Sequence, residues 1–518
     1  GGFNAEHQNV RTLSAQRDGI IVPDLPTIDT STEQDVAGGG YNHWATAGFF
    51  GRLNYNYKEK YLLEVNGRYD GTSRFMKDQR WNFFPSFSLG WNVARENFWK
   101  PLESVVNQFK LRGSWGELGN QNTSNLYPFY EILPVKSNSG NWLVNGGKTN
   151  TADIPSLVST LLTWERVRSF NVGFDFGAFS NRLTGSFDYF VRKTVDMVGP
   201  APQLPLVLGI APAIVNNADM KSYGFEIELS WRDRIGEVDY GVKFNLADAQ
   251  QKVVKYPNTT NAFSDWYAGK MSGEIWGYTS LGIAKTDEEM KEHLASLPNG
   301  GQNQLGNKWG AGDIMYADIN GDGKVDGGKG TLADPGDQRI IGNSTPRYNF
   351  GLVLDASYKG FDVSIFFQGV GKRDYAPIVG TNGAVFWGAV NNIWQSMAME
   401  EHFDYFRPEG HPMGANLNGY YPRPDFTSNK NHQVQTRYLQ DASYIRLKNL
   451  QIGYTLPKQW INKLHINRCR VYVSGDNLWT GTSLASMFDP ETLAAGDWGS
   501  GKTYPLSKVI SFGLNVNF

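Results

Sequence analysis

The chain has 518 residues, a net charge of −2 and only 19% charged side chains, so no strong field favours a nucleic-acid or anionic-lipid partner. Its single cysteine, Cys469, excludes an internal disulfide. Mean hydropathy is −0.43 and the sequence has no apolar run of the roughly 18 residues that a transmembrane helix needs. Transmembrane strands remain open, because each needs only about 9–11 residues with alternate ones apolar. Aromatic residues at 14% and 58 glycines favour such a barrel.

The first 40 residues are predicted to hold part of a strand, over 1–12, and an extracellular loop, over 13–40. They lack the basic start and apolar stretch of a signal peptide. We therefore expect either that a leader was removed or that the chain is part of a longer product.

From residue 41 onward, apolar and polar residues alternate with period two, which predicts strands with one apolar face. The predicted strands in chain order are 41–57, 60–72, 81–95, 106–117, 163–178, 181–194, 219–232, 236–252, 345–358, 361–371, 439–456, 466–478 and 507–518. In the strand over 439–456 the apolar face slips between Leu447 and Leu450, which indicates a β-bulge.

The last strand shows the pattern most clearly. Its apolar face consists of Ile510, Phe512, Leu514, Val516 and Phe518. The other face holds only serine, glycine and asparagine, so the strand separates two different media. Phe518 is also a candidate signal for the barrel-assembly machinery, which can recognise such an end by strand addition.

The connections between predicted strands alternate between short and long. The short ones include Lys58-Glu59 and Lys359-Gly360, and the long ones are 118–162, 195–218, 253–344, 372–438 and 479–506. Outer-membrane barrels have short periplasmic turns and long extracellular loops. A soluble sandwich or propeller is the alternative, but charges on the polar faces and aromatic residues near strand ends favour a barrel in lipid.

These features predict an all-β fold, a transmembrane antiparallel β-barrel whose C-terminal part, with about 13–14 strands, is formed by residues 41–518. An open sheet edge cannot lie in lipid. We therefore expect N-terminal strands that are absent from this chain to complete the barrel.

Several motifs, in a fixed order, resemble the SusC/RagA-like TonB-dependent transporters of Bacteroidota outer membranes. They are Phe50-Gly51-Arg52-Leu53-Asn54-Tyr55, Arg68-Tyr69-Asp70-Gly71-Thr72-Ser73-Arg74-Phe75, Phe84-Pro85-Ser86-Phe87, Asp318-Ile319-Asn320-Gly321-Asp322-Gly323, Gly342-Asn343-Ser344-Thr345-Pro346-Arg347, Asp441-Ala442-Ser443-Tyr444-Ile445-Arg446 and Gly475-Asp476-Asn477-Leu478. The resemblance implies a barrel of roughly 22 strands, a size at which the lumen is plugged. We find no plug domain, TonB box or early strands here.

The resemblance also implies TonB-dependent active import of oligosaccharides, or in some members peptides, across the bacterial outer membrane. The implied partners are a SusD-like surface lipoprotein that acts as a lid, the TonB–ExbB–ExbD complex, the N-terminal part of the same barrel and outer-membrane lipid. A dimer of transporter–lipoprotein pairs is a further expectation. A passive porin is the alternative function, and the upstream sequence would distinguish the two.

A calcium site is predicted in the loop that begins at Asp318. Carboxylate or amide oxygens fall at positions 1, 3, 5 and 9, with Gly323 at position 6, as in an EF-hand loop. Lys329 stands where the bidentate glutamate would be. The candidate ligands are Asp318, Asn320, Asp322, Lys324, Asp326 and Asp337. An Asp/Gly turn without an ion is the alternative, and in either case the loop would brace the extracellular side.

Aromatic residues gather in the long connections, where sugar rings could stack on them. The candidate substrate-binding residues are Trp266, Trp276, Trp309, Trp387 and Trp394, with Tyr267, Tyr278 and Phe386 nearby in sequence. The alternative is that these rings pack loop against loop or against the lid.

No catalytic site is predicted. The seven histidines have no zinc-binding spacing, and no nucleophile or phosphate-loop motif occurs. The pair Glu226 and Glu228 fits a wet lumen wall better than a glycosidase site. The sequence therefore points to a transporter rather than an enzyme.

Overall fold

The computed structural model describes residues 1–123, 125–201, 207, 209–210, 212–377, 384–388, 398–426, 428–461, 465–493 and 503–518. Fourteen of the described strands form one sheet in which every neighbouring pair is antiparallel. In sheet order they are β1 (Gly2–Ile20), β2 (Ser31–Tyr57), β3 (Tyr61–Thr72), β4 (Trp81–Asn92), β5 (Val106–Asn120), β10 (Glu165–Ala178), β11 (Leu183–Val198), β12 (Asn216–Ile235), β13 (Val238–Lys255), β18 (Arg347–Tyr358), β19 (Phe361–Lys372), β22 (Tyr444–Thr455), β23 (Arg468–Thr482) and β24 (Val509–Asn517).

The prediction of a loop over residues 13–40 was wrong, because most of these residues are strand. They form the C-terminal part of β1 and the N-terminal part of β2, which pair with each other. Only residues 21–30 make the turn between the two strands. Polar residues and the run Gly38-Gly39-Gly40 occupy both faces there, so no period-two signal marked the strand. By contrast, the predicted bulge is confirmed, because pairing on both sides of β22 skips Lys448 between Leu447 and Asn449.

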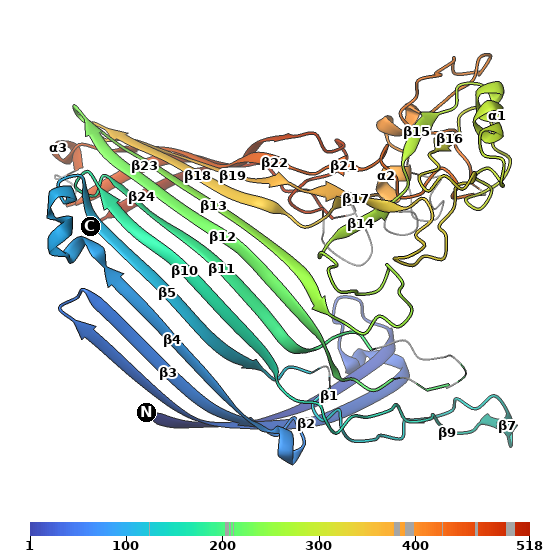
Figure 1. Ribbon diagram of the computed structural model, residues 1–518, viewed down its shortest axis with the longest axis horizontal. Coiled ribbons are helices and arrows are strands. Elements are labelled where there is room, and N and C mark those ends of the chain that lie inside the picture. Colours follow the sequence, from blue (N-terminus) through green and yellow to red (C-terminus); the bar gives the residue numbers. More distant parts are fainter. Residues whose placement is uncertain are drawn as a thin grey trace.

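The sheet curves into a wall (Figure 1). Its outward face is apolar and uncovered. Large exposed side chains on that face include Leu53, Phe87, Val473, Ile510 and Phe512, the last of them 82% exposed. A soluble monomer rarely exposes a continuous apolar surface of this extent, whereas lipid covers it in a membrane. Within the described residues, no helix has both the length and the apolar character to cross a bilayer.

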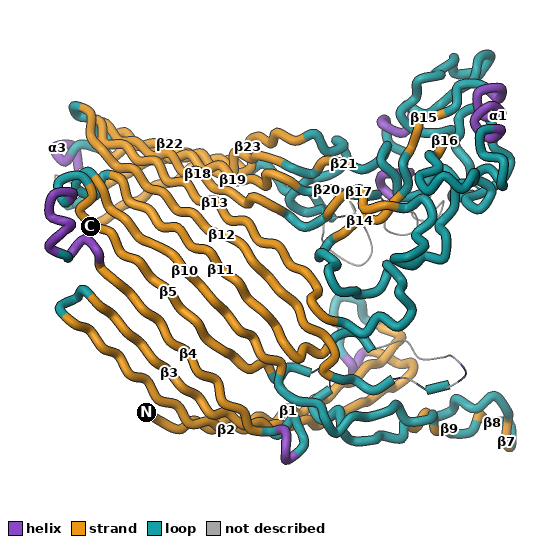
Figure 2. Tube along the Cα trace, in the orientation of Figure 1, coloured by secondary structure: helices purple, strands orange, loops and turns teal. Residues whose placement is uncertain are grey.

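The long connections carry the remaining elements, and most of them gather at one end of the wall (Figure 2). The short strands are β6 (Val135–Lys136), β7 (Leu143–Val144), β8 (Gly147–Lys148), β9 (Thr151–Ala152), β14 (Glu274–Gly277), β15 (Ser280–Ile283), β16 (Ile314–Tyr316), β17 (Arg339–Asn343), β20 (Asp374–Tyr375) and β21 (Gln440–Asp441). The α-helices are α1 (Asp287–Ala295), α2 (Ala384–Trp387) and α3 (Lys458–Ile461). In α1 the Thr286 side chain caps the first turn by accepting from the backbone N–H of Glu289.

Candidate functional site in the lumen wall and the extracellular loops

The inward face of the sheet is lined by cross-strand ion pairs. Arg112 of β5 lies 3.1 Å from Asp175 of β10 and also contacts Asp188 of β11. A further pair on this face joins Arg470 of β23 to Asp362 of β19. These pairs place a hydrated, charged surface opposite the apolar one, as expected for a wall between a polar lumen and lipid.

The extracellular loops pack against one another and share one hydrophobic core. We call the described parts of 256–346, 373–443 and 483–493 the loop assembly. Its core contains buried residues from all three connections: Tyr278, Leu297, Ile314, Tyr316, Val325, Phe386, Trp387, Tyr421, Tyr438, Ala442, Leu484, Phe488 and Leu493. Burial of so many aromatic and aliphatic side chains stabilises the loop assembly in the way that a globular domain is stabilised.

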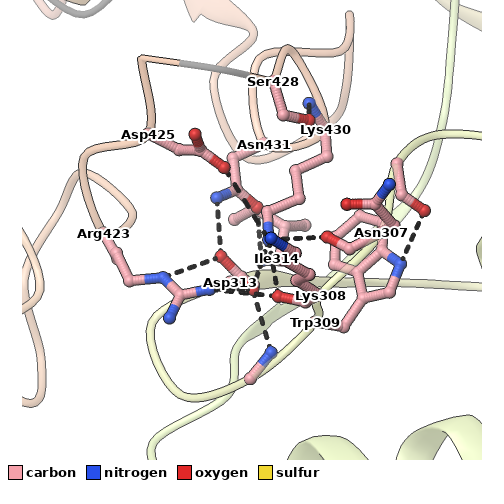
Figure 3. A network of polar contacts seen from close by, with 12 residues as sticks. Asn307, Lys308, Trp309, Asp313, Ile314, Arg423, Asp425, Ser428, Lys430 and Asn431 are labelled. Atoms are coloured by element: carbon pink, nitrogen blue, oxygen red, sulfur yellow. Dashed lines mark hydrogen bonds and ion pairs between the residues drawn. The ribbon is translucent and has the colours of Figure 1, made fainter.

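A buried ion pair crosses this assembly (Figure 3). The Lys430 ammonium lies 2.8 Å from the Asp313 carboxylate, and the two side chains are 1% and 0% exposed. Arg423 lies 2.7 Å from the same carboxylate, and the Asn431 amide donates to it at 2.9 Å. The network thus joins the 256–346 connection to the 373–443 connection.

Neutral hydrogen bonds surround this pair. The Tyr316 hydroxyl donates to the Lys430 carbonyl at 2.7 Å, and Gln435 donates to Tyr316 at 3.2 Å. Gln302 donates to the Ile314 carbonyl at 2.8 Å and accepts from the Tyr316 N–H at 3.1 Å. Because buried polar groups are costly unless paired, this arrangement specifies one relative position of the two connections.

The 483–493 segment is tied to the wall by a second set of ion pairs. Arg446, at the extracellular end of β22, lies 2.8 Å from Asp489 and 2.8 Å from Glu491. Lys448 lies 2.6 Å from Glu491. The net effect of Arg446 and of backbone N–H donors lowers the pKa of Asp489 although burial opposes that shift.

The predicted metal loop folds as a compact turn. Asp318 accepts from the N–H groups of Gly321 and Gly323, at 2.6 and 2.8 Å. Asp337, which is buried, accepts from Ile319 and Asp326, at 2.7 and 2.8 Å. The other candidate positions, Asn320, Asp322 and Lys324, lie on the same turn.

Lys324 carries a charge of the same sign as the predicted ion. Its ammonium contacts the Asp326 carboxylate, and this contact lowers the pKa of Asp326. Within the described residues no group of three or more His, Cys, Asp or Glu side chains converges as a metal site would. Calcium binding at this loop stays a prediction.

The predicted substrate aromatics mostly pack within the protein. Trp387 is buried in the loop-assembly core, and Trp309 packs against that core with the Lys430 ammonium 5.0 Å from its ring centre. Trp276 stacks on Phe263, with ring centres 4.5 Å apart. Trp266 meets Tyr256 edge to face, and Trp394 lies outside the described residues.

Other aromatic side chains are more exposed, and sequence reasoning did not single them out. Tyr130 and Trp142 project from the 121–164 connection, and Phe403 and Phe426 from the 373–443 connection. Their spacing shows no pattern that distinguishes them from buried rings. Phe518 is exposed beyond the end of β24, and a role for it in assembly stays a prediction.

Residues 2–478 match the protein family described as TonB dependent receptor-like, beta-barrel. The chain belongs to that family. Among curated TonB-dependent receptors, it is 30% identical over 499 residues to TonB-dependent receptor P3 of Formosa agariphila, covering 90% of this chain and 45% of that protein. It is 24% identical to TonB-dependent receptor SusC of Bacteroides thetaiotaomicron, covering 91% of this chain and 43% of SusC.

The fold of this TonB-dependent receptor barrel matches solved structures as well. The structure of the RagAB peptide transporter aligns with a TM-score of 0.76 and 21% identity, covering 100% of this chain and 52% of the matched chain. The chain thus spans about half the length of the relatives that it matches. Membership of this family places the protein in the bacterial outer membrane, as the sequence predicted.

Proposed function

We propose that this chain forms part of a transporter that imports oligosaccharides or peptides across the outer membrane with energy from the TonB complex. The observation that carries the proposal is the combination of an apolar-out, polar-in wall with a folded loop assembly at its extracellular end. The wall provides a hydrated path for a polar solute, and the loop assembly provides a structured surface at its mouth.

The similar proteins support TonB-dependent import more firmly than they support any one class of transported substrate. All the curated relatives named above carry TonB dependence in their names, whereas the name of RagAB states that it transports peptides. The SusC/RagA resemblance supports a SusD-like lipoprotein as lid, and a plug domain and TonB contact supplied by segments outside this chain. Structural calcium in the 318–326 turn belongs to the same proposal.

The test uses the full-length protein in a Bacteroidota host. Uptake of fluorescent maltodextrins and of a fluorescent tryptic peptide mixture is measured in cells that carry or lack its gene and a gene for a SusD-like lipoprotein. We expect one cargo class to enter only when both genes are present. Absence of gene-dependent uptake for both classes would contradict the proposal.

A passive porin is separated from a transporter by its energy requirement. We expect uptake to stop when TonB is deleted or when a protonophore collapses the proton gradient. A porin would continue to pass the same cargo at an unchanged rate. Growth on a small sugar that enters through other channels serves as the control for general toxicity.

A further inference from the structure

A cavity of about 300 Å³ opens in the loop assembly beside the Asp313 network. Its lining includes Trp387, Phe403, Tyr421, Arg423, Phe426 and His432. Trp387 and Tyr421 belong to the buried core, whereas Phe403 and Phe426 form an exposed rim, at 55% and 65% exposure. Volume and lining match those of a small-ligand site, which is mostly apolar with a few placed polar groups.

The walls of the cavity are fixed by contacts that lie outside it. His402, another lining residue, bonds through Nε2 to the Val385 carbonyl at 3.0 Å and the Phe386 carbonyl at 3.1 Å. Arg423 is held by Asp313, which in turn is paired with buried Lys430. The cavity is therefore formed before any ligand arrives, and preorganisation of this kind reduces the entropy lost on binding.

Two polar side chains in the lining have unused hydrogen-bonding capacity. Arg423 donates through Nε and Nη2 to Asp313 and through Nη2 to the Lys308 carbonyl, which leaves Nη1 without a partner among the described residues. His432 is 2% exposed and packs against Trp387 with ring centres 4.5 Å apart and the ring planes tilted by 46°. Its Nδ1 has no hydrogen-bond partner in the described part of the chain.

We propose that this cavity binds an apolar or aromatic side chain of a peptide substrate, with a main-chain carbonyl or carboxylate oxygen of that peptide accepting from Arg423. The proposal rests on the import function above and selects peptides within it. Recognition of main-chain oxygen by an arginine is independent of sequence, so one such cavity can serve many peptides that share a bulky apolar residue.

A sugar ring fits the cavity less well. Each hydroxyl that is removed from water needs a hydrogen-bond partner, and an unpaired one costs about 1–3 kcal/mol. Phe403, Phe426 and Trp387 offer ring faces, but the lining offers few acceptors for a ring of hydroxyls. A benzyl or isobutyl group makes no such demand and gains about 1.5–3 kcal/mol on full burial.

The charge of the lining adds selectivity. Burial lowers the pKa of His432 to about 4, so the imidazole is neutral at physiological pH although Asp425 nearby opposes the shift. Arg423 is then the charged group of the lining. A lysine side chain would lose its hydration in this mostly apolar lining, so basic residues are disfavoured.

The proposal is tested by calorimetry on the full-length transporter with its lipoprotein in detergent. The probes are the pentapeptides Gly-Gly-Phe-Gly-Gly and Gly-Gly-Lys-Gly-Gly, and maltohexaose. We expect the phenylalanine peptide to bind about tenfold or more tighter than either other probe. The double variant Phe403→Ser/Phe426→Ser should lose this advantage, since it removes the apolar rim.

Tyr130→Ser/Trp142→Ser is the matched control, because it removes two rings of similar exposure, 63% and 60%, from another extracellular connection. It should leave the preference unchanged. A second variant, Ala398→Trp, fills the cavity from an exposed lining position and should weaken phenylalanine-peptide binding without disturbing the core. If the rim variant and the Ala398→Trp variant both weaken phenylalanine-peptide binding, misfolding is excluded as the cause of the loss.

Equal binding of the phenylalanine and lysine peptides would overturn the proposal, as would competition by maltohexaose. If the rim variant instead weakens assembly with the lipoprotein while peptide binding shows no preference, the cavity is a socket for the lid. Energy-dependent uptake by cells that carry the same variants distinguishes failure of this inference from failure of the proposed import function. Intact uptake without a phenylalanine preference overturns only this inference, whereas loss of all TonB-dependent uptake overturns the proposed function.

Discussion

The barrel wall and the loop assembly are stabilised in opposite ways. In the wall, each strand pairs with a sequence neighbour and the apolar side chains point away from the protein. In the loop assembly the apolar side chains point inward, and the ion pair at its centre joins residues 117 positions apart. The same chain therefore follows the rules of a lipid-facing protein and those of a water-facing globular domain in two adjoining regions.

The largest expected effect comes from breaking the buried ion pair. Asp313→Ala leaves the Lys430 ammonium buried without its carboxylate, which costs about 3–5 kcal/mol. We expect the loop assembly to open while the wall stays folded. Protease cleavage within 256–346 and 373–443, compared with heat-modifiability of the barrel on gels, measures the two regions separately.

Asp153→Ala is the control for that experiment. It removes the pair between Lys136 and Asp153, whose side chains are exposed. An exposed pair contributes about 0–1 kcal/mol, so cleavage should not change. If Asp313→Ala leaves the loops as resistant as in the unmodified protein, the network does not hold the assembly together.

A charge on the outer face tests the wall. Val473→Arg places a cation among apolar residues that face lipid, next to Phe512 and Ile452, and should destabilise the barrel by about 2–4 kcal/mol. Ser474→Arg, one residue along β23, points to the lumen and should cost far less. Denaturant unfolding of the full-length barrel in vesicles gives both values. Equal costs would contradict the assignment of faces.

Acid should loosen the loop assembly before the wall. The folded pKa of His432 is about 4 and its unfolded pKa is about 6.5, so the unfolded state binds more protons between these values. Stability is therefore present in full above about pH 6.5 and is lost as the pH falls towards 4, by up to about 3 kcal/mol. Loop proteolysis at pH 7, 5.5 and 4.5 measures the change.

His432→Gln should remove most of that pH dependence, because glutamine does not titrate in this range. His465→Gln, which replaces an exposed histidine at the opposite end of the wall, should retain it. A pH response that survives His432→Gln would show that other groups cause it.

The smallest expected effect belongs to the 318–326 turn. If calcium binds there with the millimolar to submillimolar affinity of extracellular modules, 2 mM calcium should stabilise the turn by about 1–2 kcal/mol. Asp318→Asn should abolish the gain, and Asp153→Asn should keep it. Hydrogen exchange of the turn with and without a chelator measures it, and identical exchange would mean that Asp337 and Lys324 brace the turn alone.

Most strands of the wall could be predicted because their signal is local. Lipid on one side and water on the other force alternation within each strand, so strands such as β3 and β19 began and ended within a residue or two of the prediction. The signal fails where both faces meet water. The residues around Gly38-Gly39-Gly40 form a strand without any apolar face, so the alternation pattern predicted a loop there.

The loop assembly could not be predicted to the same depth. Its aromatic residues were recognised, but the burial of Trp387 and Phe386 depends on contacts between connections that are far apart in the sequence. Asp313 and Lys430 look like ordinary surface charges until the fold brings them together. The cavity beside them has no sequence motif, because its walls come from packing rather than from spacing.

The length of β2 has a practical consequence for work on living cells. At about 3.3 Å per residue its 27 residues extend over roughly 90 Å, whereas the hydrocarbon-spanning band of such a barrel is only about 25 Å tall. Even with a strong tilt, the β1–β2 hairpin is long enough to rise tens of ångströms above the bilayer. An epitope inserted in the turn between Pro23 and Asp24 would therefore be held away from the bilayer, where an antibody can reach it on intact cells.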